Sequence, residues 1–255
     1  MSAHSNIGLT GILNIENRTE NWMTSLFFCR LSEEKLQDFV DSLKTKESRS
    51  KANSVHMELF WRGVRDYRHS LIEYKVNKEG AKGKRKREIA TEVDDCLESR
   101  FWEQYKCCFG CLRHQVCKHN ERPLPHCQNY GICEDFRDEK GRGLQKLLYN
   151  NLRNTEMDIV FETDGHLFIG EAKYESDFGT DGKLVLVHQL IRQFVTASLL
   201  VKVQGKQKKV VPFLIVDDDK KSPKNNGQVD FMLCRKWLFQ ENIRTWKDPF
   251  APLYA

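Results

Sequence analysis

Two acidic residues and a lysine stand at spacings that would place them on one face of a β-hairpin. Asp164 and Gly165 form a dipeptide that is typical of a two-residue hairpin turn, and apolar residues flank it on both sides. A turn at this dipeptide sets the strand register so that Asp158 lies opposite Glu171. Lys173 stands two residues after Glu171 and therefore shares its face. The sequence thus predicts a pair of carboxylates with a lysine beside them.

Carboxylates that lie directly opposite one another repel, so this arrangement predicts a cation between them. Hard cations such as Mg²⁺ prefer carboxylate oxygens and keep coordination positions for water and phosphate. A lysine beside such an ion can orient a water molecule or offset the charge of a phosphoryl group. Glu156, which falls opposite Lys173 in the same register, is a further candidate for the site. The alternative is an ordinary hairpin with solvated charges, but the run 167–172 is too apolar for a solvated strand.

An aspartate at the start of one strand and Glu-Ala-Lys at the end of the next resemble the motif of the PD-(D/E)xK nuclease superfamily. Met157 stands where the motif has proline, a position that varies widely in the family. The resemblance covers roughly residues 143–217. It implies that Asp158 and Glu171 bind Mg²⁺ or Mn²⁺ together with the backbone carbonyl of Ala172. It also implies that Lys173 is the catalytic lysine.

The same resemblance implies a restriction-endonuclease-like core and the hydrolysis of phosphodiester bonds, with 5′-phosphate and 3′-hydroxyl products. DNA is the expected substrate, RNA is an alternative, and a restriction-type or defence endonuclease is the expected class. Many relatives add an acid from a helix before the hairpin, for which Glu92 and Glu98 are both candidates. Some place a glutamine from the following helix near the site, for which Gln189 is a candidate. Cutting both strands at one site would favour a homodimer.

Nine cysteines are a high number for a chain of this size, and most of them lie between Cys96 and Cys133. Proteins of reducing compartments rarely hold disulfides, so clustered cysteines there indicate metal ligands. We expect residues 105–140 to form an insertion held together by a metal, because the segment has prolines and glycines but no core of its own. Structural Zn²⁺ is favoured over a 4Fe–4S cluster. The candidate ligands are Cys108, Cys111, Cys117, Cys127 and Cys133.

Three other interpretations of the cysteine-rich segment remain open. The spacing of residues 108, 111 and 117 is similar to that in a group of iron–sulfur nucleases of the same superfamily, which implies a DNA end-processing or repair nuclease. In that group these cysteines follow the catalytic core, whereas here they precede it. A non-catalytic zinc protein that binds nucleic acid is the second interpretation. The third, an HNH-type site at His119, Asn120 and His126, lacks a clear ββα frame.

Composition sets broad limits on the class of protein. The chain has 255 residues, of which 40% are hydrophobic and 30% charged, as in soluble globular proteins. Its net charge of +5 permits nucleic acid as a partner without demonstrating one. No apolar run is long enough to span a bilayer, and the first residues show no signal-peptide pattern. We therefore expect no membrane partner and a cytoplasmic (or nuclear) location.

The predicted site needs elements that hold the hairpin in place. Apolar periodicity predicts a helix over 143–154 that leads into the hairpin and a long helix over 184–204 that covers the sheet. A buried strand is expected over 210–216. We therefore expect an α/β fold in which residues 141–255 form a mixed sheet flanked by helices.

The first part of the chain is expected to be an appended region. Residues 1–104 are predicted to be mainly helical, with a helix over 88–105. Residues 78–87 contain six basic side chains and two glycines, and are expected to form a flexible loop that contacts phosphates. The candidate nucleic-acid contacts are Lys82, Lys84, Arg85, Lys86 and Arg87.

Overall fold

The computed structural model describes residues 24–25, 28, 31–46, 53–105, 141–173, 178–179, 188–216 and 227–246. The five cysteines predicted to ligate a metal lie outside these residues. The elements in chain order are α2 (Glu33–Ser42), β1 (His56–Trp61), α3 (Gly63–Glu79), α4 (Gly83–Tyr105), α6 (Gly141–Arg153), β2 (Met157–Glu162), β3 (His166–Ala172), α7 (Gln189–Val203), β4 (Lys209–Val216), α8 (Gly227–Cys234), the 3₁₀ turn η4 (Gln240–Asn242) and β5 (Ile243–Thr245).

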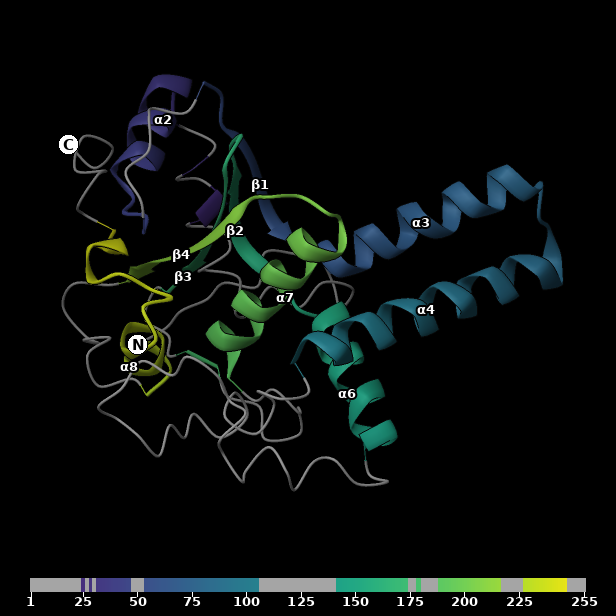
Figure 1. Ribbon diagram of the computed structural model, residues 1–255. Helices are drawn as coiled ribbons and strands as arrows, with labels where there is room; N and C mark the ends of the chain where they lie inside the picture. Colours follow the sequence, from purple (N-terminus) through teal and green to yellow (C-terminus); the bar gives the residue numbers. More distant parts are fainter. Residues whose placement is uncertain are drawn as a thin grey trace, which may run out of the picture.

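The strands form one mixed sheet of five strands in the order β1-β2-β3-β4-β5. β2 pairs antiparallel with both β1 and β3, whereas β4 runs parallel to β3 and β5 runs parallel to β4. Helices lie against the sheet on both sides (Figure 1). The predicted α/β fold with a mixed sheet flanked by helices is therefore confirmed, and α6, α7 and β4 fall where the sequence predicts them. None of the described helices is both long and apolar enough to cross a membrane.

Both faces of the central strands are covered, which explains why β3 and β4 are apolar along most of their length. On one face, α2 contributes Phe39, whose ring lies 5.8 Å from the ring of Phe161 and 5.7 Å from that of Phe213. On the other face, Val160 and Ile169 pack with residues of α7. Burial on both sides therefore holds the β2–β3 hairpin in a single position between two layers of helix.

The hairpin has the register that the Asp-Gly turn predicts. Val160 pairs with Ile169, and the backbone N–H of Thr163 donates to the carbonyl of His166 at 3.0 Å. Gly170, next to Glu171 on β3, lies under the ring of Phe213 on β4. A Cβ atom at this position would approach Phe213 Cζ to 2.2 Å, so only glycine allows this close contact between the two strands.

The N-terminal region supplies a strand that the sequence analysis does not predict. β1 pairs antiparallel with β2 at the edge of the sheet, and Trp61 lies opposite Met157. His56 and Glu58 are exposed, whereas Met57 between them and the three residues after them are half-buried. This alternation is short and is followed by aromatic and arginine residues, so the sequence alone did not predict the strand within a region expected to be mainly helical.

The prediction of a flexible basic loop over residues 78–87 is wrong. α3 continues to Glu79, Gly80 adopts the left-handed conformation with φ 62°, and α4 begins at Gly83. Lys and Arg are good helix formers, and Arg85 pairs with Glu88 and Glu92 on the same helix. The basic residues therefore belong to the start of α4 instead of a loop. The helix predicted over 88–105 is present and begins five residues earlier.

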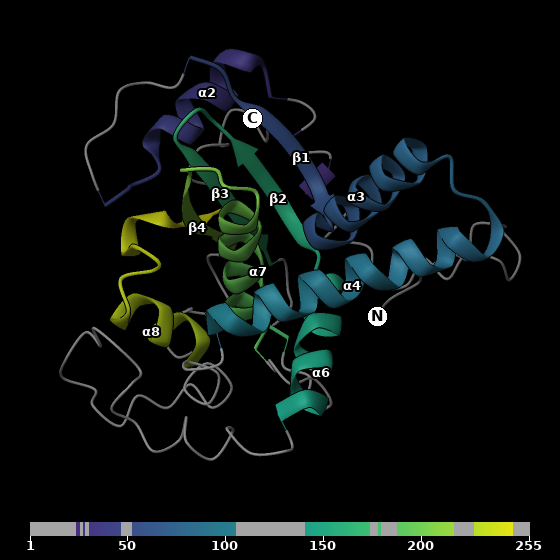
Figure 2. The same ribbon diagram turned by 45° about the vertical axis from the view of Figure 1, so that its right-hand side comes forward.

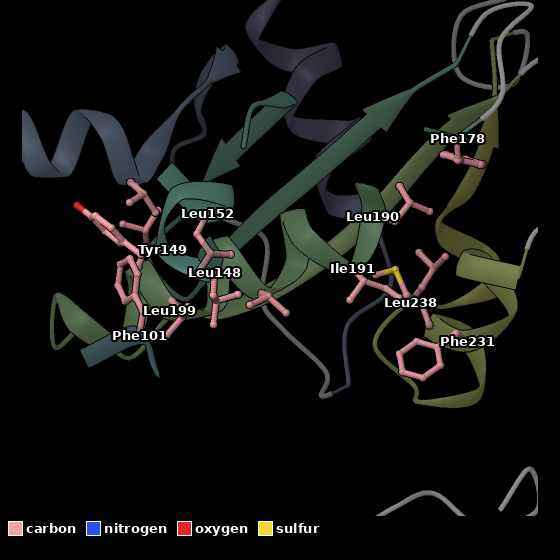
Figure 3. Close-up of a cluster of buried hydrophobic side chains, with 14 of the residues drawn as sticks. Phe101, Leu148, Tyr149, Leu152, Phe178, Leu190, Ile191, Leu199, Phe231 and Leu238 are labelled. Carbon is pink, nitrogen blue, oxygen red and sulfur yellow. The ribbon is translucent and has the colours of Figure 1, made fainter. Parts of the chain in front are cut away.

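Helices α3 and α4 form an antiparallel pair that extends away from the sheet (Figures 1 and 2). We call this pair the α3–α4 arm. The base of the arm joins an apolar cluster between α4, α6, α7 and α8, which Figure 3 shows in part. Its buried members include Phe101, Leu148, Leu152, Leu199 and Phe231.

A polar network fastens the base of the arm beside this cluster. Asp94 on α4 accepts hydrogen bonds from Arg68 on α3 at 2.5 and 2.7 Å, and from the hydroxyl of Tyr149 on α6 at 2.6 Å. Burial raises the pKa of Asp94, but the bonds from Arg68 and Tyr149 outweigh it and hold this pKa below its usual value. Burial and the bond to Asp94 raise the pKa of Tyr149. The charged carboxylate therefore stabilises the contact of three helices.

We predict that Asp94→Asn lowers the free energy of unfolding at neutral pH by about 1–3 kcal/mol, the usual range for leaving a buried partner unsatisfied. Because the folded pKa of Asp94 lies below its unfolded value, this stabilisation is present above about pH 4 and is lost as the pH falls. Urea unfolding of both proteins at neutral pH and near pH 3 measures the difference. A difference that does not narrow at low pH would contradict the proposed role of the charge.

Candidate active site

The hairpin brings the predicted acidic residues together at one end of the sheet. Continuing the register one pair beyond Ile159 and Gly170 places Asp158 opposite Glu171. The backbone N–H of Ala172 donates to Oδ2 of Asp158 at 3.0 Å, which fixes the Asp158 side chain against the end of β3. The structure thus places Asp158 beside the Glu-Ala-Lys segment, as the turn predicts.

Glu171 is a buried carboxylate, with only 1% of the residue exposed. Its Oε1 accepts a hydrogen bond from the amide of Gln189 at 2.5 Å and forms an ion pair with Lys173 Nζ at 2.5 Å. Its Oε2 accepts a hydrogen bond from the amide of Gln193 at 2.5 Å. A charge removed from water is costly unless it is paired and hydrogen-bonded, and here both oxygens have donors. Lys173 and α7 therefore stabilise the carboxylate within the fold.

Gln193 belongs to the site, although sequence reasoning selected only Gln189. It stands one turn after Gln189 on the face of α7 that meets the sheet, and it is buried. Its amide also donates to the backbone carbonyl of Glu156 at 3.0 Å, so it connects α7 to both strands of the hairpin. The one-turn spacing of the two glutamines was the signal for Gln193 in the sequence. Two polar residues on the exposed face of a helix have the same spacing, so the signal did not single it out.

The side chain of Gln189 is itself held in place. The Oε1 of Gln189 accepts a hydrogen bond from the backbone N–H of Gly179 at 3.0 Å. Gln228 on α8 accepts from the N–H of Leu190 at 3.1 Å and donates to the carbonyl of Gly179 at 3.3 Å. Because its own oxygen is engaged, the amide of Gln189 is oriented with its N–H₂ group toward Glu171.

The backbone of Lys173 is held on two sides. Its N–H donates to the carbonyl of Ile215 on β4 at 2.8 Å, and its carbonyl accepts from the indole N–H of Trp246 at 2.8 Å. Trp246, which directly follows β5, is buried. It was not selected from the sequence, because nothing local connects it with a lysine so far away in the chain. These bonds leave the ammonium group in a defined position beside Glu171.

The side chains of three further acidic candidates pair with groups outside the carboxylate pair. Glu156 forms an ion pair with Arg62 at 2.5 Å, at the start of α3. Glu92 pairs with Arg85 in the arm at 2.7 Å, so the structure places it away from the carboxylate pair. Glu98 faces α6, and its pKa is raised by burial and by the neighbouring Asp95. The predicted helix acid is therefore not seen at the carboxylate pair among the described residues, because α4 turns these side chains toward the arm and α6.

The donor set suits a hard divalent cation. Carboxylate oxygens of Asp158 and Glu171, with the carbonyl of Ala172, are the ligand type that Mg²⁺ and Mn²⁺ prefer. Lys173 already supplies positive charge at Glu171, so the carboxylate has a cation partner before any metal binds. Within the described part of the chain no three His, Cys, Asp or Glu side chains gather as a metal site. The candidate set is smaller, because it has only two carboxylates, and a backbone carbonyl and water would have to fill the other coordination positions.

We predict that Lys173→Met destabilises the fold by about 3–5 kcal/mol, because it leaves the Glu171 carboxylate buried without its cation. The double variant Lys173→Met, Glu171→Gln is expected to recover part of this loss, because it removes the unpaired charge as well. Urea unfolding of the wild type, both single variants and the double variant gives the coupling energy. Additive effects would show that the two residues are not coupled.

Comparison with known proteins provides no relative against which to judge this site. No family model, curated protein or solved structure matches the chain. Its interpretation therefore rests on the contacts that its own residues make.

Proposed function

We propose that the protein is a metal-dependent nuclease that hydrolyses phosphodiester bonds of DNA. One observation carries the proposal: Glu171 is buried opposite Asp158 and holds Lys173 at 2.5 Å. A protein that only binds nucleic acid has no need to bury one carboxylate opposite another, at a cost that Lys173 and two glutamines must offset.

The order of the surrounding elements supports the same proposal. After the hairpin, α7 returns across the sheet and β4 lies parallel to β3. A hairpin with the acidic motif, then a helix, then a strand is the order expected for a restriction-endonuclease-like core. In this proposal the core consists of β2, β3, α7 and β4, and the residues before it determine substrate choice.

Each residue of the site has a distinct proposed role. Asp158, Glu171 and the carbonyl of Ala172 would hold Mg²⁺ or Mn²⁺. The ion, when bound, lowers the pKa of a coordinated water and polarises the phosphate. Lys173 would donate from its ammonium group to a water or a phosphate oxygen beside Glu171, which would offset the negative charge that grows in the transition state. Gln189 and Gln193 keep both oxygens of Glu171 oriented, which is the usual task of residues behind a metal ligand.

We predict that the purified protein cleaves DNA in the presence of Mg²⁺ or Mn²⁺ and that Asp158→Ala lowers cleavage by at least about 100-fold. Loss of residues that merely support a metal ligand already costs 10–100-fold. The substrates are circular plasmid, linear duplex and single-stranded DNA. Asp95→Ala, which removes an exposed carboxylate from α4, is the matched control and should cut like the wild type.

The outcomes of this cleavage experiment are distinct. Discrete fragments would indicate a site-specific endonuclease of the restriction or defence class, and a smear would indicate non-specific cleavage. Equal cleavage by the wild type and Asp158→Ala would exclude the hairpin as the active site. Absence of cleavage of any DNA would count against a deoxyribonuclease, and the same comparison would then be made with RNA.

Structural Zn²⁺ on the cysteine-rich segment is part of the proposal. We predict a colourless protein that contains zinc, and a lower zinc content in the double variant Cys108→Ser, Cys111→Ser. Cys234→Ser, at an exposed free thiol of α8, is the matched control and should keep the metal. Elemental analysis measures the zinc content of each protein, and the visible spectrum shows whether the protein is coloured. A brown protein with absorbance in the visible blue would instead favour an iron–sulfur cluster and an end-processing nuclease.

A further inference from the structure

The tip of the α3–α4 arm concentrates positive charge far from the body of the protein. Residues 75–88, which we call the arm tip, contain seven basic residues and only two acidic ones. This excess equals the net charge of +5 of the whole chain. The arm tip includes the end of α3, the turn at Gly80 and the start of α4. Figures 1 and 2 show both helices leaving the sheet side by side.

Arg85 is the basic residue of the tip that joins the two helices, and the other basic residues of the tip do not have this role. Arg85 bonds Glu79 on α3 at 2.9 Å and Glu92 on α4 at 2.7 Å, so its charge is neutralised within the arm. The basic residues beside it are exposed, and the nearest carboxylate to Lys84 Nζ lies 3.9 Å away on Glu88. No ion pair of Lys78, Lys82, Lys86 or Arg87 is found in the described ranges. Their charges are thus available to a partner.

The tip is an ordered turn, which distinguishes it from a charged tail. Gly80 adopts a left-handed conformation that only glycine accepts without strain. The N–H of Ala81 donates to the carbonyl of Val76 at 2.9 Å, which closes the end of α3. Arg85 then links the two helices across the turn. The backbone that carries the exposed charges is therefore ordered before any partner binds, so binding costs less backbone entropy than it would for a flexible loop.

The base of the arm begins at the candidate active site. Arg62, directly before α3, pairs with Glu156, whose carbonyl accepts the hydrogen bond from Gln193. Gln193 is one of the two glutamines that hold Glu171. α3 has 17 residues, which correspond to a length of about 25 Å at 1.5 Å per residue. The exposed charges of the tip are therefore held about one helix length from the carboxylate pair.

We propose that the arm lies along a nucleic-acid duplex and that its tip binds phosphates about seven base pairs from the bond at the active site. This inference rests on the proposed nuclease function and adds a duplex substrate to it. Phosphates of one strand are spaced by about 3.4 Å, so the length of α3 corresponds to roughly seven base pairs. The residues that contact phosphate are Lys82, Lys84, Lys86 and Arg87, and Arg85 holds them in position.

Two other anionic partners fit the arm less well. Membrane-binding helices place large apolar residues beside their basic ones. Proteins that bind single strands offer a series of aromatic rings for stacking. Among the described residues, Tyr74 is the one large hydrophobic side chain with high exposure, at 64%. In the described part of the arm, the exposed cations have Tyr74 as one exposed aromatic neighbour instead of a series of rings or large apolar side chains, which matches the phosphates of a duplex better than either alternative.

The test compares two triple variants that remove equal charge. The tip variant is Lys82→Gln, Lys86→Gln, Arg87→Gln. The control variant is Lys35→Gln, Lys46→Gln, Lys236→Gln, which changes exposed lysines outside the arm. Binding of a 30-base-pair duplex, about four times the span of the arm, is measured by fluorescence anisotropy in EDTA over a range of salt concentrations. EDTA prevents cleavage, so the readout does not depend on the metal site.

We predict that the tip variant binds the duplex about 10–100-fold more weakly and that its slope of log K against log salt is smaller by about three. The control variant should change the slope by less than about one. Duplexes of about six base pairs should bind the wild type and the tip variant alike, because they are too short to reach the tip. Circular dichroism and thermal unfolding check that both variants are folded.

Several outcomes would overturn the inference. These are equal loss of affinity in both variants, an unchanged slope in the tip variant, or a loss that persists with the short duplex. A tip variant that loses binding to anionic phosphatidylserine vesicles but keeps binding to the duplex would assign the arm to a membrane surface. If binding depends on the tip while Asp158→Ala still cleaves like the wild type, the arm is retained and the proposed active site fails.

Discussion

The buried carboxylate of Glu171 is the constraint on which the rest of the site depends. A charge at this depth is tolerated only when donors reach both of its oxygens. The ammonium of Lys173 comes from the same strand end, and the two amides come from successive turns of α7. The position of α7 over the sheet is therefore tied to the chemistry of the site. Because Gln189 and Gln193 stand one turn apart, a shift of this helix by one turn would bring one of them to the other's place and leave one oxygen of the carboxylate without its amide donor.

The same requirement gives the two faces of the hairpin different tasks. The face toward α2 is filled with aromatic and branched side chains and supplies most of the apolar contact around Phe161 and Phe213. The face toward α7 is apolar in the middle of the strands and polar at both ends, with Asp158 and Glu171 at one end and Glu162 at the other. The same pair of strands thus packs in the apolar core and carries the polar site at its end, so the site rests on a rigid support.

Local signals predicted the hairpin and its neighbours well. The Asp-Gly turn determines the register, and the register determines that Asp158 meets Glu171, so no long-range information was needed. The apolar patterns of α6, α7 and β4 are equally local. The helical start of α4 was missed because a run of lysines and arginines was interpreted from its charge, while its helix propensity and its pairing with Glu88 and Glu92 were not weighed.

The residues that could not be predicted are those whose role depends on distant partners. Trp246 reaches the carbonyl of Lys173 across the sheet, and β1 pairs with β2 although the arm, the cysteine-rich segment and α6 lie between them in the chain. A single sequence shows propensity and spacing but not which far segments meet. Gln193 is an intermediate case, since its helix face was visible while its partner was not.

The pairing of Trp61 with Met157 affects how the sequence of such a protein can evolve. The chain leaves the sheet after Trp61 and returns to it at Met157, which lies directly opposite, so the residues between them form one excursion from the sheet. The entropic cost of closing an excursion grows only slowly with its length, by about 0.6 kcal/mol for each doubling. Insertions at the arm tip, away from the contacts that α4 and α6 make with α7, would therefore leave the carboxylate pair undisturbed. Specificity can diversify in this excursion while the chemistry next to it is preserved.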